Sequence, residues 1–582
     1  MTAVPTEPSS ESRFERGLTW AAGLVLLLAL LAEFRSLIRP DTGFLLDAAN
    51  RVLDGAVIYR DVVEINPPLI IWLNMIAVEV SRLSGLSDMV VYRVGFTLLL
   101  LGCLGVAMTV VRCFLLPGEA RLQRLLLAAL AFVLFALPGR DYGEREHLVL
   151  GLVLPYAFLA AARAGGTPVP GGWGWLAGGL AGLGFALKPH FLLLWPALEC
   201  APRLRRQLPW WRVLPETAAI GLVLAGYLGA IALVTPQYFE LVSRLAGAYT
   251  RFLYDPFWHL LVTGPGAAVT FLALLATVAL RQRAGHPALW DGLALATVAA
   301  YLAGAAQQKG LDYHFYPSLG LAVVLLVLVT TDLRSPPARL AERLYRVVAA
   351  SALVTVAASA LVHAAAGAIG YDPQRAEFET RVRIVREHAG NGRVFVMSYH
   401  IGSTYPLINY SGVRSASRFP QLWILPAAYW DELHADAPLR FRDRAQMGPV
   451  ERYLNDAALA DFERYQPTVL VVLRHARDLP TNGLRRLDYI AYFGRDPRFA
   501  PLLRRYQWVA DVGEYAVYAR LSGAAPRSAR PPMATAGTQD LLGTDQEGLQ
   551  VRLLTRAFLA QLGVFLLATA FFARRPGFGR PA

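Results

Sequence analysis

Apolar runs about as long as a membrane-crossing helix recur along almost the whole sequence, and this feature constrains the fold more than any other. A helix needs about 20 apolar residues to cross the hydrocarbon core. Of the 582 residues, 55% are hydrophobic and only 17% are charged, a balance that a water-soluble domain cannot bury. The sequence therefore predicts an all-α polytopic membrane protein with about 12 transmembrane helices. The predicted spans are 17–38, 94–111, 122–138, 147–163, 173–187, 190–202, 213–234, 262–280, 288–306, 315–332, 347–368 and 553–573.

Arginines in the connecting loops orient these spans. Every loop that this scheme places inside the cell carries arginine, as the positive-inside rule requires, and both termini are then cytoplasmic. The scheme requires that 67–86, which carries Arg82 near its end, does not cross the membrane. We interpret this segment as a surface or re-entrant helix on the outer face. The net charge of +13 is explained by the basic loops and gives no reason to expect nucleic-acid binding.

A region near the C-terminal end has a different pattern. Short Val-rich and aromatic segments alternate there with a helical stretch at 376–388, which predicts a small α/β domain on the extracytoplasmic side. The expected strands are Val394–Met397, Thr468–Leu473, Trp508–Val512 and Tyr515–Leu521. The predicted organisation is a disordered cytoplasmic segment 1–16, a transmembrane domain 17–369, the α/β domain 370–522, a flexible linker 523–550, a last span 551–573 and a cytoplasmic tail 574–582.

Ionisable residues at the outer ends of spans are the candidates for chemistry, because charge at membrane depth is costly. The outer segments are 39–93, 139–146, 235–261 and 307–314. In the first of them, Asp41 follows the first span and opens a helix that Gly55 should stop. Two roles remain open for Asp41, a helix N-cap and a general base for an acceptor hydroxyl. Asp47 fits an ion-paired helix face, and Asn66 precedes two prolines that stiffen the chain.

The second outer segment, GRDYGEREH at 139–147, is short and densely charged. Acidic and basic residues interleave in it, which a topology signal alone does not require. Asp141 is a candidate to assist the base or to hold a metal, and Arg145 is a candidate anion ligand. Glu144 is counted as a supporting residue.

Lysine usage gives the most informative clue. The 56 cationic residues include two lysines, Lys188 and Lys309, each at the predicted outer end of a span and each followed closely by histidine. Snorkelling from a span end explains one such lysine better than it explains two in the same setting. We therefore predict a phosphate site that draws both segments together. Its further members are His190, His314 and Arg251, with Tyr313 in support; a metal held by the histidines is the weaker interpretation, because no ligand cluster at recognisable spacing is present.

These features resemble the GT-C superfamily of integral membrane glycosyltransferases over roughly residues 15–330. The likeness lies in Asp41 after the first span, a short helix ending in glycine, Tyr59, the Asn-Pro-Pro-Leu at 66–69, Arg93 opening the next span, an acidic second outer loop and the Lys-Pro at 188–189. It is similar in style to the bacterial branch of protein O-mannosyltransferases and lipid A aminoarabinose transferases. Asp41 departs from the acidic pair of many relatives, because Thr42 follows it.

The resemblance implies a bacterial inner-membrane enzyme that moves a sugar from a polyprenyl-phosphate donor to an extracytoplasmic glycan, lipid or protein. Asp41 would be the base, and the cations at the span ends would hold the phosphate as leaving group. No cofactor is required by this chemistry, and a divalent cation is left open. Two alternatives stand beside it: a multi-span transporter or lipid flippase, and a non-catalytic envelope assembly protein. One shared outer cavity favours the transferase, a path to the cytoplasm favours transport, and scattered residues favour the assembly protein.

Overall fold

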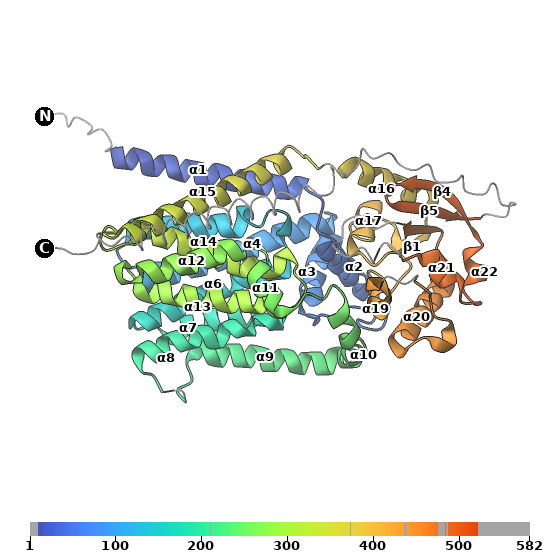
Figure 1. Cartoon of the computed structure of the whole chain (residues 1–582), viewed down its shortest axis with the longest axis horizontal. Coiled ribbons are helices and arrows are strands. Elements are labelled where there is room, and N and C mark those ends of the chain that lie inside the picture. The colour runs from blue at the N-terminus through green and yellow to red at the C-terminus, as the bar shows by residue number, and fades with distance from the viewer. Residues whose placement is uncertain are drawn as a thin grey trace. The chain divides into compact units, whose positions relative to one another are not determined.

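The computed structural model describes residues 10–209, 211–372, 374–435, 439–474, 484 and 487–521, with side chains from residue 23 onward. These residues divide into two compact units (Figure 1). The first unit reaches Asp372 and leaves out 242–252 and 339–341, which belong with the residues after 373 in the second unit. The predicted linker 523–550, last span 551–573 and tail 574–582 lie outside the described residues, as do residues 1–9 of the predicted N-terminal segment.

Helices that run side by side build the first unit (Figure 1). Two of them, α4 and α5, continue into π-helical turns, η1 (Val111–Leu115) and η2 (Phe132–Ala136). Its α-helices are α1 (Ser10–Arg35), α2 (Pro40–Leu53), α3 (Leu69–Ser84), α4 (Asp88–Val110), α5 (Ala120–Ala131), α6 (Arg145–Gly165), α7 (Gly171–Leu187), α8 (Leu194–Arg206), α9 (Pro215–Val234), α11 (Phe257–Thr263), α12 (Ala267–Leu280), α13 (Pro287–Ala306), α14 (Tyr316–Thr331) and α15 (Leu340–Ala368). The helix α10 (Gln237–Arg251) begins in this unit, and its residues from Val242 onward belong to the second.

A multi-pass membrane protein is confirmed. Six helices are long and apolar enough to cross a bilayer, and a seventh span is formed if α11 and α12 count as one broken crossing. The six are Asp88–Leu115, Arg145–Gly165, Pro215–Val234, Pro287–Ala306, Asp312–Thr331 and Leu340–Ala368. A helix also occupies each other predicted span within the described residues, but these helices are not among the six, so the total of twelve stays a prediction.

Two segments differ from the helices that the sequence predicts. The predicted span 262–280 is two helices that meet at 72°, because Gly264, Pro265 and Gly266 interrupt the chain between α11 and α12. The helix α1 begins at Ser10, inside the segment that the sequence predicts to be disordered. The segment 67–86 contains α3, a helix of 16 residues.

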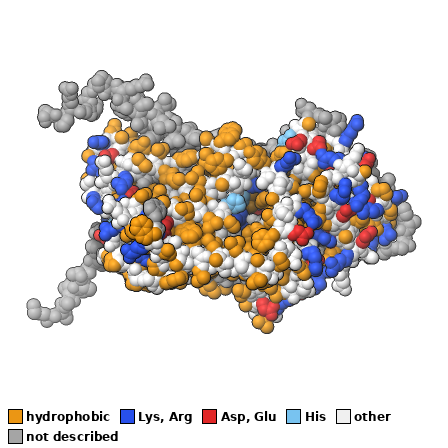
Figure 2. Space-filling model, turned by 90° about the horizontal axis from the view of Figure 1, so that it is seen from below, with side chains coloured by type: hydrophobic (Ala, Val, Ile, Leu, Met, Phe, Trp, Pro, Cys, Tyr) orange, Lys and Arg blue, Asp and Glu red, His pale blue; other side chains and the backbone are white. Residues whose placement is uncertain are grey.

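Burial separates central helices from peripheral ones in the first unit. In the most apolar stretches of α6 and α14, 89% and 83% of the residues are buried, whereas in α9 and α15 only 17% are. The exposed side chains of the peripheral helices include Leu222, Leu233 and Val354, as expected for a surface that faces lipid. The face of this unit seen in Figure 2 is mostly hydrophobic, with Lys and Arg gathered at one end.

Glycine lets α7 and α9 approach closely. A Cβ atom at Gly178 would lie 2.4 Å from the backbone oxygen of Glu216, so any larger residue would push the helices apart. The same close approach positions the carboxylate of Glu216 next to Arg163 of α6, at 2.6 Å. This ion pair lies near the opposite end of α6 from the charged loop 139–147.

The second unit is a small mixed α/β domain, as the sequence predicts. Its five-stranded sheet has the order β2-β1-β3-β5-β4, parallel from β2 to β3 and antiparallel from β3 to β4. The central strand β3 is buried along its whole length, and Phe462 of α20 packs on Phe395 of β1. The elements are α16 (Arg375–Ala389), β1 (Arg393–Met397), α17 (Leu407–Ser411), β2 (Arg414–Ser415), α18 (Ile424–Ala428), α19 (Trp430–His434), α20 (Pro449–Tyr465), β3 (Val469–Leu473), α21 (Tyr489–Gly494), α22 (Ala500–Leu503), β4 (Tyr506–Val512) and β5 (Tyr515–Arg520).

Candidate functional site

Asp41, the first candidate residue along the chain, lies on the helix α2. Proline at the first helical position sets the start of α2, and Arg39 occupies the N-cap, so Asp41 lies in the first turn and is not the cap. A carboxylate is favourable there because the helix N-terminus carries partial positive charge. The helix ends where Gly55 adopts a left-handed backbone conformation with φ of +95°.

Arg39 connects this first turn to the second outer loop. Its guanidinium lies 3.0 Å from the Asp141 carboxylate and 3.5 Å from that of Glu144. Glu144 precedes α6 and is almost wholly buried. Burial, with a contribution from Asp41, raises the pKa of Glu144 above its ordinary value. Three carboxyl groups from two segments therefore gather around one arginine.

A buried ion pair joins α6 to the two lysine segments. The Nζ atom of Lys188, which directly follows α7, lies 2.9 Å from Glu146 and donates a hydrogen bond of 3.2 Å to Gln307. His314 approaches the same Glu146 carboxylate at 3.7 Å. Lys188, Glu146 and His314 are all buried. The segments that carry Lys188 and His314 thus meet around a carboxylate.

Arg145 is the buried cation beside this pair. Its side chain is 5% exposed, and its Nε and Nη1 atoms have no hydrogen-bond partner among the described residues. It interacts electrostatically with the carboxylates of Glu64, Glu146 and Asp41. Glu64 is itself held in place, because its Oε1 atom accepts hydrogen bonds from the backbone and side chain of Asn66 at 2.7 and 2.5 Å.

Lys309 is the second lysine of the same neighbourhood. It lies in the loop between α13 and α14 and is partly buried, which lowers its pKa to about 8. It acts electrostatically on His314, as do Lys188, Arg145 and His190. His190 is exposed, and Tyr313 interacts with both Arg39 and Arg145.

Two of the candidate residues have other surroundings. Arg251 belongs to the second unit and pairs with Asp431 at 3.9 Å. Asp47 pairs with Arg51 one turn further along α2, at 4.0 Å, in keeping with an ion-paired helix face. Among the described residues, no group of three or more His, Cys, Asp or Glu side chains is arranged to hold a metal ion.

Sequence reasoning missed three members of the cluster: Arg39, Glu64 and Glu146. Glu146 was visible in the charged loop 139–147, but loop position alone does not reveal that it points inward to a lysine of another helix. Glu64 lies two residues before Asn66, and that adjacency was the available signal. Arg39 was not singled out as a site residue because it lies at the end of a predicted span, where snorkelling arginines are common.

The helical unit and the small mixed domain have the fold of a solved membrane protein, ArnT, in keeping with the sequence resemblance. The chain is similar to the crystal structure of ArnT from Cupriavidus metallidurans bound to undecaprenyl phosphate, with a TM-score of 0.53 and 14% identity. That match covers 89% of this chain and all of ArnT, and the apo form of ArnT gives a TM-score of 0.50 with the same identity and coverage.

A weaker likeness is to the archaeal oligosaccharyltransferase AglB from Archaeoglobus fulgidus, solved with an inhibitory peptide and a dolichol-phosphate. It has a TM-score of 0.42 and 10% identity, and covers 87% of this chain and 75% of AglB. No family model matches the sequence, and no curated protein matches it significantly.

Proposed function

We propose that this protein is a glycosyltransferase of the bacterial inner membrane that moves a sugar from a polyprenyl-phosphate donor to an extracytoplasmic acceptor. The observation that carries the proposal is Arg145. A buried guanidinium with two unbonded nitrogens is costly unless an anion completes its hydrogen bonds. A lipid phosphate is such an anion, and ArnT, whose fold this chain shares, was crystallised with undecaprenyl phosphate.

The charges around Arg145 suit the chemistry of the transfer. Lys188 lies within electrostatic range of Arg145, and Lys309 acts on the same His314. Together the three cations would stabilise the phosphate as it leaves the anomeric carbon. Asp41, within range of Arg145 and Lys188, would take the proton of the acceptor hydroxyl as that oxygen forms the new glycosidic bond. One base and one displacement predict inversion at the anomeric carbon.

Glu146 and Arg39 have positioning roles in this proposal. Glu146 would hold the Lys188 ammonium in place and so determine where this ammonium contacts the donor phosphate. Arg39 would hold Asp141 and Glu144 close to Asp41, so that the base lies among ordered carboxyl groups. Glu144, with its raised pKa, is suited to donate a hydrogen bond in its protonated form.

The interior of α6 argues against a transport path. Glu146 and Arg163 lie on this one helix about 26 Å apart, from the helical rise of 1.5 Å per residue. Between them, two side chains form hydrogen bonds: His147, next to Glu146, bonds to the backbone oxygen of Leu134, and Tyr156 bonds to Glu199. The charged cluster at one end is therefore separated from the Arg163–Glu216 pair at the other by a buried apolar stretch.

The test uses purified full-length protein in detergent with a panel of polyprenyl-phosphate sugars, and it follows release of the free lipid phosphate. Asp41→Asn should lower release by about a hundredfold or more while donor binding persists. Asp54→Asn is the matched control, because Asp54 ends the same helix but pairs with Arg82 on an exposed surface.

Three results would decide the matter. Loss of release in Asp41→Asn alone supports the transferase with Asp41 as base. Equal release in Asp41→Asn and wild type moves the base to Asp141. The phosphate site is refuted if the wild-type protein neither binds nor turns over any donor and if Lys188→Ala and Lys309→Ala change nothing. That result favours transport.

A further inference from the structure

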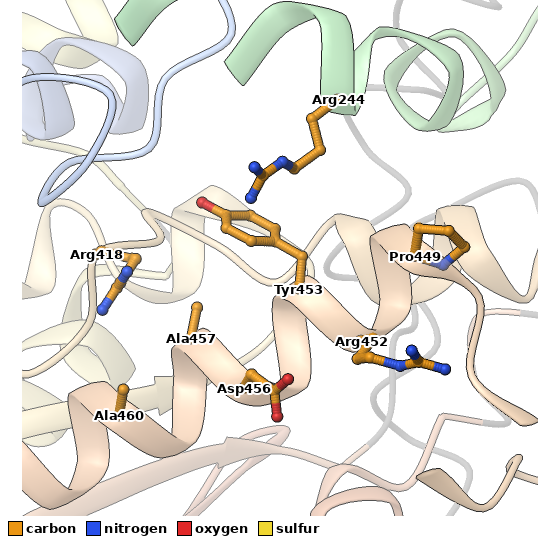
Figure 3. Close-up of a pocket in the computed structure, with 8 residues that line it drawn as sticks. All are labelled: Arg244, Arg418, Pro449, Arg452, Tyr453, Asp456, Ala457 and Ala460. Atoms are coloured by element: carbon orange, nitrogen blue, oxygen red, sulfur yellow. The ribbon is translucent and has the colours of Figure 1, made fainter. Parts of the chain in front are cut away.

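A hollow of about 620 Å³ lies on the second unit and shares no lining residue with the cluster described above. One face of α20 forms its floor, because its lining residues on this helix recur at intervals of one, three or four positions. Arg244 of α10 and Arg418 from the loop after β2 complete the lining (Figure 3). The volume falls within the range of about 300–1,000 Å³ typical of small-molecule sites.

Positive charge dominates this hollow. Three arginines line it, Arg244, Arg418 and Arg452, against a single carboxylate, that of Asp456. Asp456 is itself compensated twice, by Arg444 and by Arg498 at 2.8 Å. Arg418 forms a bidentate pair with Asp461, which fixes its guanidinium plane. Because the guanidinium of Arg418 is engaged by this carboxylate, an anion in the hollow would be met chiefly by Arg244 and Arg452.

An aromatic ring stands among these arginines. The guanidinium of Arg244 lies 5.0 Å from the centre of the Tyr453 ring, and Figure 3 shows it reaching from α10 toward that ring. Packing holds α10 there, since Leu245 is fully buried and Tyr249 meets Trp423 at 5.4 Å. The floor beside Tyr453 is lined by Ala457 and Ala460, whose small side chains leave room for a ligand.

We propose that this hollow binds an anionic saccharide, a glycan with carboxylate or phosphate groups, as the acid-bearing part of the acceptor. Its role in acceptor binding rests on the proposed function, whereas the binding itself does not. The arginines match the acidic groups, and the Tyr453 ring with its hydroxyl matches a sugar ring that is apolar on its faces and polar at its edge. The lining offers no large aliphatic side chain for an acyl chain, which favours a saccharide over a lipid.

Binding is measured by calorimetry on the full-length protein in detergent, with oligogalacturonate as the acidic saccharide and an oligoglucose of equal length as the neutral one. We expect oligogalacturonate to bind and to weaken with added salt, and oligoglucose not to bind. Arg452→Gln and Arg244→Gln should each weaken binding by about tenfold. The matched control is Arg464→Gln, an exposed arginine on the same helix outside the hollow, which should bind as wild type does.

Equal weakening by Arg464→Gln and Arg452→Gln would overturn the site, because it would reveal general attraction to a basic surface. Oligoglutamate that binds as tightly as oligogalacturonate would overturn the saccharide class in favour of an acidic peptide. Displacement of oligogalacturonate by short-chain phosphatidylglycerol, lost in Arg452→Gln, would overturn it in favour of a lipid headgroup. Oligogalacturonate binding in a protein that releases no lipid phosphate from any donor would sink the transferase and leave this site standing.

Discussion

Donor affinity should fall as the pH rises through 8, because Lys309 loses its charge there. Burial lowers the pKa of this lysine to about 8 in the free protein, so the ammonium is mostly protonated at pH 7 and mostly neutral at pH 9. The proposed donor is a phosphodiester, whose single negative charge does not change over this range. A site that needs cationic Lys309 therefore binds the donor tightly at pH values below 8. Above pH 8, Lys309 must take up a proton when the donor binds.

The size of the effect follows from the protonated fraction. That fraction falls from about nine-tenths at pH 7 to about one-tenth at pH 9. An ammonium about 4 Å from a phosphate contributes up to about 4 kcal/mol at an effective dielectric constant of 20, so the neutral form binds far more weakly. Donor affinity should therefore fall about tenfold between pH 7 and pH 9. Lys309→Arg keeps its charge throughout and should remove this part of the slope.

The assay is a donor titration by tryptophan fluorescence at half-unit steps from pH 6.5 to 9.5, in wild type and Lys309→Arg. Glu144 also has a raised pKa, and its ionisation would repel the donor as the pH rises. Its effect is common to both proteins, so the difference between the two slopes isolates Lys309. Identical slopes, or a flat wild-type profile, would refute a role for Lys309 in holding the phosphate.

Three further predictions concern the buried charges and the helix packing. Arg145→Gln should weaken donor binding by about tenfold or more in titration, since it removes the buried guanidinium that an anion would complete; unchanged donor affinity would contradict this account. Glu216→Gln should cost about 3 kcal/mol of unfolding free energy, because Arg163 loses its partner at 2.6 Å, and should leave donor affinity unchanged in titration. Gly178→Val should lower the melting temperature by forcing α7 from α9, whereas Gly179→Val, with open space at its Cβ, should not; equal melting temperatures would refute the packing argument.

Local signals were enough to predict most of the elements. The apolar runs place a helix at every predicted span within the described residues, and Val394–Met397 and Ala376–His388 correspond to β1 and α16 within a residue at each end. Such patterns succeed because periodicity and propensity act over a few neighbouring residues. The bend between α11 and α12 also had a local signal, the Gly-Pro-Gly at 264–266, which the apolar character of its surroundings outweighed.

The site depends on contacts between distant segments, and these were only partly predictable. The rarity of lysine pointed to Lys188 and Lys309, and the structure brings their segments together. The rarity of lysine did not reveal that Lys188 pairs with Glu146, because that pairing depends on how α6 and α7 are oriented in the fold. Arg251 was grouped with the lysines by its outer loop alone, whereas its part of α10 belongs to the second unit.

The two edge strands of the sheet limit how other chains can attach to the second unit. The strand β2 is only two residues long, and β4 carries an irregularity between Trp508 and Ala510. An incoming strand needs a long, regular row of unpaired backbone groups, and bulged or very short edges deny it one. Sheet-to-sheet aggregation is discouraged in the same way. Partners that dock on this domain should therefore recognise its helices and loops and should not extend its sheet.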